Sequence, residues 1–383
     1  MQKEFIVFGS PLIEEAEIAE VVASLKSGWL GTGPKVHQFE QMFREYKDTK
    51  YAMALNSCTA ALHLAMLAIG IKPGDEVIVP TMTFAATANA VIHAGGKPVL
   101  ADCQRETMNI DPEDIERKIT TKTKAIIPVH FAGRPCDMDA IMDIAKRHNL
   151  KVIEDCAHAI ETEYKGKKAG TIGDIGCFSF YVTKNIVTGE GGMAITNNEE
   201  YANKIKIMAL HGMSKDAWKR FGDEGYKHYQ VVYAGFKYNM MDIQAAIGIH
   251  QLPRVDKYWQ RRKEIWKHYN KAIKDLPVFT PLPPEEHTRH AYHLYTLLID
   301  IDNVNLTRDQ FMVEMTRRNI GVGVHYIALH LHPYYQERYK YQYSDFPKAE
   351  WISERSVSIP LSAKLMDEET QKVTQAVREI LTK

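Results

Sequence analysis

The segment Met138-Asp-Ala-Ile-Met-Asp-Ile-Ala-Lys-Arg-His148 and the run Lys151-Val-Ile-Glu-Asp155 show the alternation that decides the fold. A stretch with helical spacing leads through a turn at Asn149 into a short run of apolar residues. The alternation extends from about residue 50 to residue 200, with further strands expected at 51–55, 75–80, 97–101 and 124–130 and helices at 59–69 and 85–94. Apolar strands separated by helices predict an α/β fold with a mostly parallel central sheet and helices on both faces.

The second half of the chain has a different pattern. The polar, aromatic-rich stretch 214–237 has no clear period and predicts a long loop, a kind of segment that is often functional in compact domains. We expect one or two long helices at 244–273, a hinge in the proline-dense stretch 277–284, a strand at 292–300 and helices at 307–318 and 368–381. These elements predict a large domain of residues 1–250 and a smaller C-terminal α+β domain of residues 251–383.

Composition narrows the class of protein. At 383 residues the chain is long enough for two domains, each with its own core. Lys plus Arg and Asp plus Glu both number 48, so no net charge attracts nucleic acid or an anionic membrane. The first residues lack the apolar run of a signal peptide, and no later stretch is apolar enough to span a bilayer. Five scattered cysteines argue against a disulfide framework or a zinc ribbon and favour a cytoplasmic location.

Lys184 is the most informative single residue. It lies in Phe178-Ser-Phe-Tyr-Val-Thr-Lys184-Asn-Ile-Val-Thr-Gly-Glu-Gly-Gly192, after a short aromatic strand and before a glycine cluster. An amine partly withdrawn from water loses some of its preference for the charged form, so it can attack a carbonyl and hold an aldehyde cofactor. The alternative is a surface lysine on a turn between a strand and a loop.

Asp155 ends a strand, where the carboxyl edge of a parallel sheet usually places its ligand. A buried carboxylate there could hold the ring nitrogen of pyridoxal phosphate in its protonated form, which makes the ring an electron sink. The alternatives are a helix N-cap or a pairing with Lys151 or His158. His158 could orient Asp155 or touch the ring, or it could be a structural histidine. Glu154 points to the opposite face and is the weaker candidate.

A phosphate site and an aromatic platform complete this set. The turn Asn56-Ser57-Cys58-Thr59 leads into a helix whose first amides and nearby hydroxyls could bind phosphate, although simple N-capping explains it as well. Ser179 could add a further phosphate contact. Phe84, at the end of a strand, could stack on a flat ring, and the alternative is a core phenylalanine.

Two other kinds of site are disfavoured. His330 and His332 alternate and could face the same way, but no cysteine or carboxylate stands at ligand spacing beside them, so we expect no metal. The stretch 189–192 is not a Gly-x-Gly-x-x-Gly motif after a strand, so a dinucleotide-binding fold is not indicated.

Taken together, these segments closely resemble the DegT/StrS family of pyridoxal-phosphate sugar aminotransferases, which implies the fold-type I aminotransferase architecture. The resemblance covers nearly the whole chain. Its blocks are Ser27-Gly-Trp-Leu-Gly-Thr-Gly-Pro, Ser57-Cys-Thr-Ala-Ala-Leu-His, Pro80 to Asn89, Ala125-Ile-Ile-Pro-Val-His-Phe-Ala-Gly, Glu154-Asp-Cys-Ala-His-Ala, the Lys184 segment, Tyr238-Asn239-Met-Met-Asp-Ile-Gln-Ala-Ala and Gly323-Val-His-Tyr.

The resemblance implies a role for each site residue. Lys184 and Asp155 are the catalytic pair, and the cofactor-binding residues are Ser57, Cys58, Thr59, Phe84, Asp155, His158, Ser179, Lys184 and Asn239. Asn239 resembles an asparagine that reaches the phosphate from the neighbouring subunit, which implies a homodimer with shared active sites. The implied substrate-binding residues are Gly31, Thr32, His325 and Tyr326. Cys58 stands where many members of the family have glycine.

The resemblance also implies a reaction. Because the lysine is present, rather than the histidine found in the dehydratases of the family, transamination is favoured, with L-glutamate as amino donor and a nucleotide-linked 4-ketosugar as acceptor. The chain resembles members that act at C4, such as the UDP-4-amino-4-deoxy-L-arabinose aminotransferase, which serve lipopolysaccharide or surface polysaccharide synthesis. The alternatives are a 3-ketosugar aminotransferase, a pyridoxal-phosphate-dependent sugar dehydratase, and a regulator that binds the cofactor without turnover.

Overall fold

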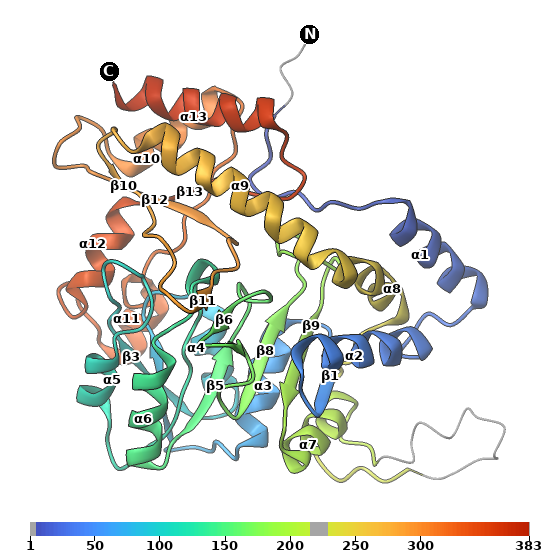
Figure 1. The fold of residues 1–383 in the computed structure, drawn as a ribbon. Helices are drawn as coiled ribbons and strands as arrows, with labels where there is room; N and C mark the ends of the chain where they lie inside the picture. Colours follow the sequence, from blue (N-terminus) through green and yellow to red (C-terminus); the bar gives the residue numbers. More distant parts are fainter. Residues whose placement is uncertain (1–4, 215–228, 383) are drawn as a thin grey trace.

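The computed structural model describes residues 5–214 and 229–382 and is built around one seven-stranded sheet, whose strands can be followed in Figure 1. Its order is β1 (Tyr51–Leu55), β9 (Gly192–Thr196), β8 (Ile175–Ser179), β5 (Lys151–Asp155), β4 (Thr123–Ile126), β2 (Glu76–Pro80) and β3 (Lys97–Ala101). The pairs from β3 to β8 are parallel, and only β9 runs antiparallel to both of its neighbours. The prediction of a mostly parallel central sheet is confirmed.

Helices cover both faces of this sheet because its strands alternate their apolar side chains between two cores. Val77 and Ile153 point into a core that includes α3 (Cys58–Ala68), α4 (Ala85–His93) and α7 (Glu199–Ala209). Ile78 and Val152 point to the other side, where α6 packs. On that side the cover is α6 (Met138–His148), with α5 (Pro112–Lys118) beside it and α2 (Pro34–Lys47) over the strands near β1.

The predicted element at 138–148 is α6, with Asp137 as its N-cap and Asn149 as a left-handed C-cap. The strand predicted at 124–130 is wrong at its end, because β4 stops at Ile126. Pro128 has no N–H to donate to a ladder, so the chain leaves the sheet there. It stays close enough that the His130 amide donates to the Asp155 carbonyl.

The C-terminal part builds a second, three-stranded sheet of β10 (Val278–Phe279), β12 (Tyr295–Ile299) and β13 (Ser356–Ile359). The stretch predicted as one or two helices forms α8 (Asp242–Gln251) and α9 (Val255–Ile273), with Pro253 in the 3-10 turn between them. The predicted α10 (Arg308–Arg317), capped by Thr307, and α13 (Asp367–Leu381) are present. Further elements are α1 (Glu15–Ser27), α11 (Pro333–Tyr339), α12 (Pro347–Arg355) and a small sheet of β11 (Thr288–Arg289), β6 (Glu163–Tyr164) and β7 (Lys167–Lys168).

A separate apolar core joins α9, α10, α13 and the second sheet, with Trp266, Tyr295 and Phe311 at its centre. Ile6, from the start of the chain, also packs into this core. The division into domains of residues 1–250 and 251–383 therefore stays a prediction. The proline-dense stretch is held by Arg134, whose guanidinium donates to the carbonyls of Leu282 and Pro283.

Most of the loop predicted at 214–237 lies outside the described residues. Its described end, 229–237, bridges back to the segment after α7, with Met213 opposite Val231 and Leu210 opposite Lys237. Within the described residues we find no helix that combines the length and apolar character needed to cross a membrane.

Candidate active site

Lys184 lies at the carboxyl edge of the large sheet, five residues after the end of β8 at Ser179. It lines a cavity of about 520 Å³. Most of the predicted site residues line the same cavity, although they come from separate segments of the chain: Ser57, Cys58, Thr59, Phe84, Asp155, His158, Ser179, His325 and Tyr326. The structure therefore brings these residues together, and the surface-lysine alternative for Lys184 is wrong.

Burial lowers the pKa of the Lys184 amine to about 8, against the opposing effects of Cys58 and Asp155. A lysine with a pKa near 8 has a substantial neutral fraction at physiological pH. The neutral amine is the form that attacks a carbonyl carbon. The cavity therefore contains a nucleophilic nitrogen that is already partly prepared for such a reaction.

Asp155 is buried and its two carboxylate oxygens are held separately. Oδ2 accepts a hydrogen bond from the Thr87 hydroxyl at 2.8 Å, and Oδ1 accepts from the Ala157 amide at 3.1 Å. Burial raises the pKa of Asp155, while Thr87, Ala157 and Lys184 favour its ionised form. The alternative pairing with Lys151 does not occur, because Lys151 bonds to Asp174 instead.

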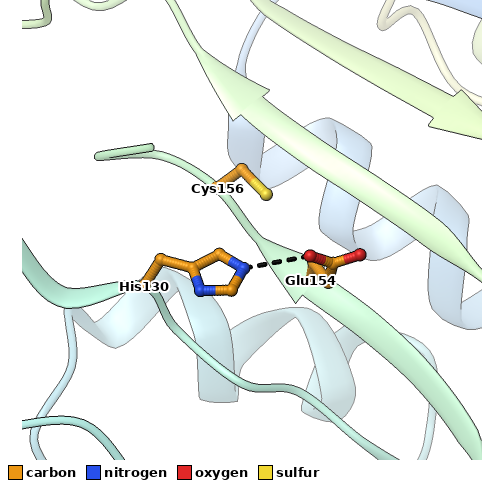
Figure 2. A group of neighbouring side chains, drawn as sticks. All are labelled: His130, Glu154 and Cys156. Atoms are coloured by element: carbon orange, nitrogen blue, oxygen red, sulfur yellow. Dashed lines mark hydrogen bonds and ion pairs between the residues drawn. The ribbon is translucent and has the colours of Figure 1, made fainter. Parts of the chain in front are cut away.

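Glu154 lies on the opposite face of β5, as predicted, in a group with His130 and Cys156 (Figure 2). Its carboxylate accepts from His130 Nε2 at 3.0 Å and from the amides of Gly170, Ile172 and Gly173. Both nitrogens of His130 are in use, because Nδ1 accepts from the Cys136 amide. A metal ligand needs a free lone pair, so this buried group is a hydrogen-bond network rather than a metal site.

The two histidines considered as metal ligands have other partners. His330 is buried and bonds through Nδ1 to Thr81 and through Nε2 to Glu350. His332 bonds through Nε2 to the carbonyl of Ile327. Neither belongs to the cluster of candidate metal ligands found among the described residues.

The start of α3 forms one end of the cavity. Ser57 is its N-cap and accepts from the Ala60 amide at 3.1 Å, so the predicted capping role is present. Because this cap uses the Ala60 amide, the amides of Cys58 and Thr59 are the first-turn donors that remain for an anion. Cys58 has a helical conformation with negative φ, so glycine is not required there. Gly192 lets β9 approach this turn, because a Cβ there would lie 2.3 Å from the Ser57 carbonyl carbon.

Phe84 is not a core residue. It is the N-cap position of α4, its side chain is 62% exposed, and it lines the cavity. Its ring centroid lies 6.2 Å from that of Tyr326. An exposed aromatic ring beside an open cavity is available to cover a flat ligand.

The hydrogen bonds of His158 determine which of its ring nitrogens carries the proton. Its Nδ1 accepts from the Ala132 amide, so the proton of the neutral ring is on Nε2 and is donated to the Tyr326 hydroxyl at 3.2 Å. Burial holds the pKa of His158 well below its usual value, so the ring is neutral. Because Tyr326 accepts from His158, its own hydroxyl hydrogen is free to be donated elsewhere. His158 therefore acts on Tyr326 and does not orient Asp155.

Two functional candidates were missed by the sequence analysis. The ring of His293 lies against that of His158, tilted by 34° with ring centroids 4.4 Å apart, and its Nδ1 bonds to the Asn185 carboxamide oxygen at 2.8 Å. Asn185 donates its own Nδ2 to Glu161, so its oxygen faces His293 and Nδ1 must carry the proton. Asn185 directly follows Lys184, and that adjacency was the available indication in the sequence.

Three of the predicted site residues lie outside the cavity of Lys184. Thr32 and Asn239 line a second cavity of about 590 Å³, and the side chains of the two residues are hydrogen-bonded to each other. Gly31 is near them, because its carbonyl accepts from the Asp242 amide. The structure does not bring these residues into the cavity of Lys184. A contribution of Asn239 to a neighbouring subunit stays a prediction.

The cavity fits pyridoxal phosphate by the chemistry of its donors. An amine prepared for an aldehyde, an ionisable acid for a pyridine nitrogen and a helix start with hydroxyls for a phosphate line one space. A volume of about 520 Å³ is in the range of ordinary cofactor sites. No described residue of the cavity contradicts this fit.

Comparison with known proteins decides the family. The model of the DegT/DnrJ/EryC1/StrS aminotransferase family matches residues 11–378. The chain belongs to this family. It is 51% identical over 382 residues to an uncharacterized protein of Methanocaldococcus jannaschii, covering 100% of this chain and 99% of that protein. It is 48% identical over 382 residues to the spore coat polysaccharide biosynthesis protein SpsC of Bacillus subtilis, covering 99% and 98%.

Solved structures agree with this family membership. Spr1654 of Streptococcus pneumoniae, which is named a sugar aminotransferase, matches in its PMP form with a TM-score of 0.92 at 34% identity, covering 98% of this chain and 99% of that one. Its PLP form matches with a TM-score of 0.91. The fold-type I architecture, the aminotransferase class and pyridoxal phosphate as cofactor are therefore confirmed for this DegT/DnrJ/EryC1/StrS protein.

Proposed function

We propose that this aminotransferase transfers an amino group from L-glutamate to the C4 keto carbon of a nucleotide-linked sugar. The observation that carries the proposal is the Lys184 amine, whose pKa is lowered by desolvation to about 8, in one cavity with Asp155. The names of the relatives, a spore coat polysaccharide protein and a sugar aminotransferase, support a sugar as acceptor. Among members acting at C4, the UDP-4-amino-4-deoxy-L-arabinose type is the subgroup that we propose.

In this proposal each residue of the cavity has its own role in binding the cofactor or moving a proton. When bound, pyridoxal phosphate supplies an aldehyde that takes up the amino group and a ring that withdraws electrons. We assign Lys184 Nζ to hold the aldehyde carbon and to move the proton at the carbon that bears nitrogen. Asp155 holds the proton of the ring nitrogen. Phe84 covers the ring, while the phosphate is bound by Ser57, Cys58, Thr59 and Ser179.

The acceptor side of the cavity is formed by His325 and Tyr326 in this assignment. Burial lowers the pKa of His325 to about 4, so this ring is a neutral hydrogen-bonding group. Its Nδ1 is paired with the Ser358 hydroxyl at 2.9 Å. The free hydroxyl hydrogen of Tyr326 is a donor suited to a hydroxyl or keto oxygen of the sugar.

A homodimer with shared sites is part of the proposal. Asn239 Oδ1 is buried without a hydrogen-bond partner among the described residues, and Asn239 lines a cavity with Gly33 and Trp29, whose side chain is half exposed. A second copy that covers this face would bring its own Lys184 cavity toward Gly31, Thr32 and Asn239. We place the enzyme in the cytoplasm, where nucleotide sugars for polysaccharide or lipopolysaccharide synthesis are made.

A substrate panel tests the proposal. The protein loaded with pyridoxal phosphate is converted with L-glutamate, then mixed with UDP-, GDP- and dTDP-linked 4-ketosugars and 3-ketosugars. We expect return of the original cofactor absorbance only with a 4-ketosugar, and a product with nitrogen at C4 by NMR. Turnover at C3, loss of a hydroxyl from the sugar without amination, or a glutamate-inert cofactor would each replace this proposal with one of the alternatives.

A further inference from the structure

Thr87 and Thr83 form a hydroxyl chain behind Asp155 that the assignments above do not use. Thr83 Oγ1 lies 2.8 Å from Thr87 Oγ1, which lies 2.8 Å from Asp155 Oδ2. All three side chains are buried, with exposures of 2%, 1% and 4%. Both threonines line the cavity of Lys184.

The direction of each hydrogen bond follows from counting protons. An ionised carboxylate only accepts, so the single hydroxyl hydrogen of Thr87 is donated to Asp155. Thr87 then has only lone pairs for its neighbour, so Thr83 donates to Thr87. If Asp155 were protonated and donated to Thr87, the whole chain would have to reverse. While Asp155 is charged, the hydrogen bonds therefore run from Thr83 to Thr87 and from Thr87 to Asp155.

The place of Thr87 in the fold adds to this effect. Thr87 is the third residue of α4, a helix of nine residues. Its hydrogen bond therefore places the Asp155 carboxylate against the first turn of that helix. The positive end of a helix favours an anion. Desolvation acts in the opposite direction and disfavours the charge. Without the hydroxyl chain, Asp155 would keep only the Ala157 amide as a direct donor.

We infer that Thr87, supported by Thr83, is a positioning residue that keeps Asp155 ionised and directed at the ring nitrogen of the cofactor. This inference rests on the role proposed for Asp155. Thr87 acts through Asp155 and through the ring nitrogen, so its effect must vanish when either of them is removed.

The experiment compares the dissociation constant of pyridoxal phosphate with that of its 1-deaza analogue, in which carbon replaces the ring nitrogen. Thr87→Val removes the hydroxyl at nearly constant volume and is expected to weaken pyridoxal phosphate binding roughly tenfold, since a hydrogen bond to a charged group is lost. Binding of the 1-deaza analogue should change by less than about twofold. Thr83→Val should weaken binding of the natural cofactor only about twofold. The Thr83 hydroxyl strengthens the hydrogen bond from Thr87 but makes no hydrogen bond to Asp155 itself.

Three further variants complete the design. Thr87→Ser restores the hydroxyl and should restore affinity. Thr196→Val removes a buried threonine hydroxyl that bonds to the Asp174 carbonyl at the far end of β9, and should leave both affinities unchanged. In the Asp155→Asn background, Thr87→Val should add no more than about a twofold effect, because the charge that the Thr87 hydroxyl stabilises is already gone.

The outcomes separate the two proposals. Unchanged binding of pyridoxal phosphate in Asp155→Asn overturns the role of Asp155 and with it the proposed function. Weakened binding in Asp155→Asn with unchanged binding in Thr87→Val overturns only the inference about Thr87. Equal loss for the natural cofactor and the 1-deaza analogue would show a packing effect and would also overturn it. If Thr87→Val does not fold, the Thr83→Val and Thr87→Ser pair decides by the same comparison.

Discussion

Desolvation lowers the pKa of two lysines in the described part of this enzyme to about 8, yet their surroundings differ, because Lys47 is fully buried and Lys184 is only partly covered. Lys47, at the end of α2, donates to the carbonyls of Ile160 and Ala169, both at 2.9 Å. Its amine also lies 4.4 Å from the centre of the Phe178 ring. Lys184 lines an open cavity instead. A lowered pKa therefore does not distinguish a catalytic lysine from a structural one, whereas access to a ligand does.

The strand β5 separates the two lysines. Glu154 is among the acids that favour the charged form of Lys47, and Asp155 has the same effect on Lys184. Adjacent residues of a strand point to opposite faces, so one strand supplies an acid to each site. On one face, Glu154 accepts hydrogen bonds from four N–H donors. On the other face, Asp155 lines the cavity of Lys184.

The largest expected effect comes from removing each amine. Lys184→Ala should lower transamination by at least about 10⁴-fold and abolish the yellow colour of the bound cofactor, since no amine remains in the cavity. Its free energy of unfolding should stay within about 1 kcal/mol of wild type, because a desolvated amine has been removed. Steady-state kinetics and urea denaturation measure the two quantities.

Lys47→Ala is the matched control, and we expect it to lower stability while leaving turnover intact. It empties a packed site, removes the amine donor from the Ala169 carbonyl and leaves the Ile160 carbonyl with only the long contact from the Tyr46 hydroxyl, so it should lose about 3 kcal/mol of stability. Turnover per folded molecule should remain close to wild type. Loss of turnover in both variants without loss of stability in either would remove the distinction between the two lysines.

Substitutions of Asp155 and Glu154 should show the same contrast, with Asp155 affecting activity and Glu154 affecting stability, and with somewhat smaller effects than those of the lysines. Asp155→Asn should keep the fold and slow the proton shift by roughly 10²-fold or more, because the ring nitrogen is no longer held charged. Glu154→Gln should destabilise the protein by roughly 2 kcal/mol or more, since its new amide group faces donors. Single-turnover absorbance and denaturation together measure this; a fast Asp155→Asn enzyme would contradict the assignment.

The sequence predicted the parts of the molecule that depend on local pattern. The bounds of α6 and β5, the cap at Thr307 and the opposite directions of Glu154 and Asp155 follow from periodicity and turn chemistry. The end of β4 was missed because Pro128 interrupts a run that is otherwise apolar. The gathering of Lys184, Asp155 and the α3 start follows from the rule that ligands bind at the carboxyl edge of parallel strands.

What the sequence could not predict depends on hydrogen-bond direction between distant segments. The tautomers of His158 and His293 are set by Ala132 and Asn185, neither of which is recognisable as a partner from spacing. Lys47 was not singled out, because its partners Ile160 and Ala169 are ordinary backbone carbonyls more than a hundred positions away. Such partners become visible only when the chain is folded.

A moderate effect is expected in the pH dependence of stability. The pKa of Lys47 is about 8 in the folded state and near 10.5 when exposed, so between these values the unfolded chain binds more protons. Stability conferred by this site therefore rises with pH across that window and is lowest below pH 8. Relative to Lys47→Met, the wild type should gain up to about 3 kcal/mol over the window. Urea denaturation from about pH 7.5 to about pH 10.5 tests this, and a constant difference between the two proteins would contradict it.

The smallest effect, and the most direct test of access, is the pH dependence of cofactor capture. Neutral amine accumulates as pH rises toward the pKa of Lys184, about 8, so covalent capture of pyridoxal phosphate by the cofactor-free enzyme should accelerate to that point and then level off. We expect roughly a tenfold rise from pH 7 to pH 9, followed by absorbance and located by borohydride reduction and peptide mapping. Lys47 has a similar pKa but no cavity, so in folded Lys184→Ala it should remain unlabelled at every pH at which the fold persists. Label on Lys47 in that folded variant would show that pKa alone governs reactivity here, and that the cavity does not select the lysine.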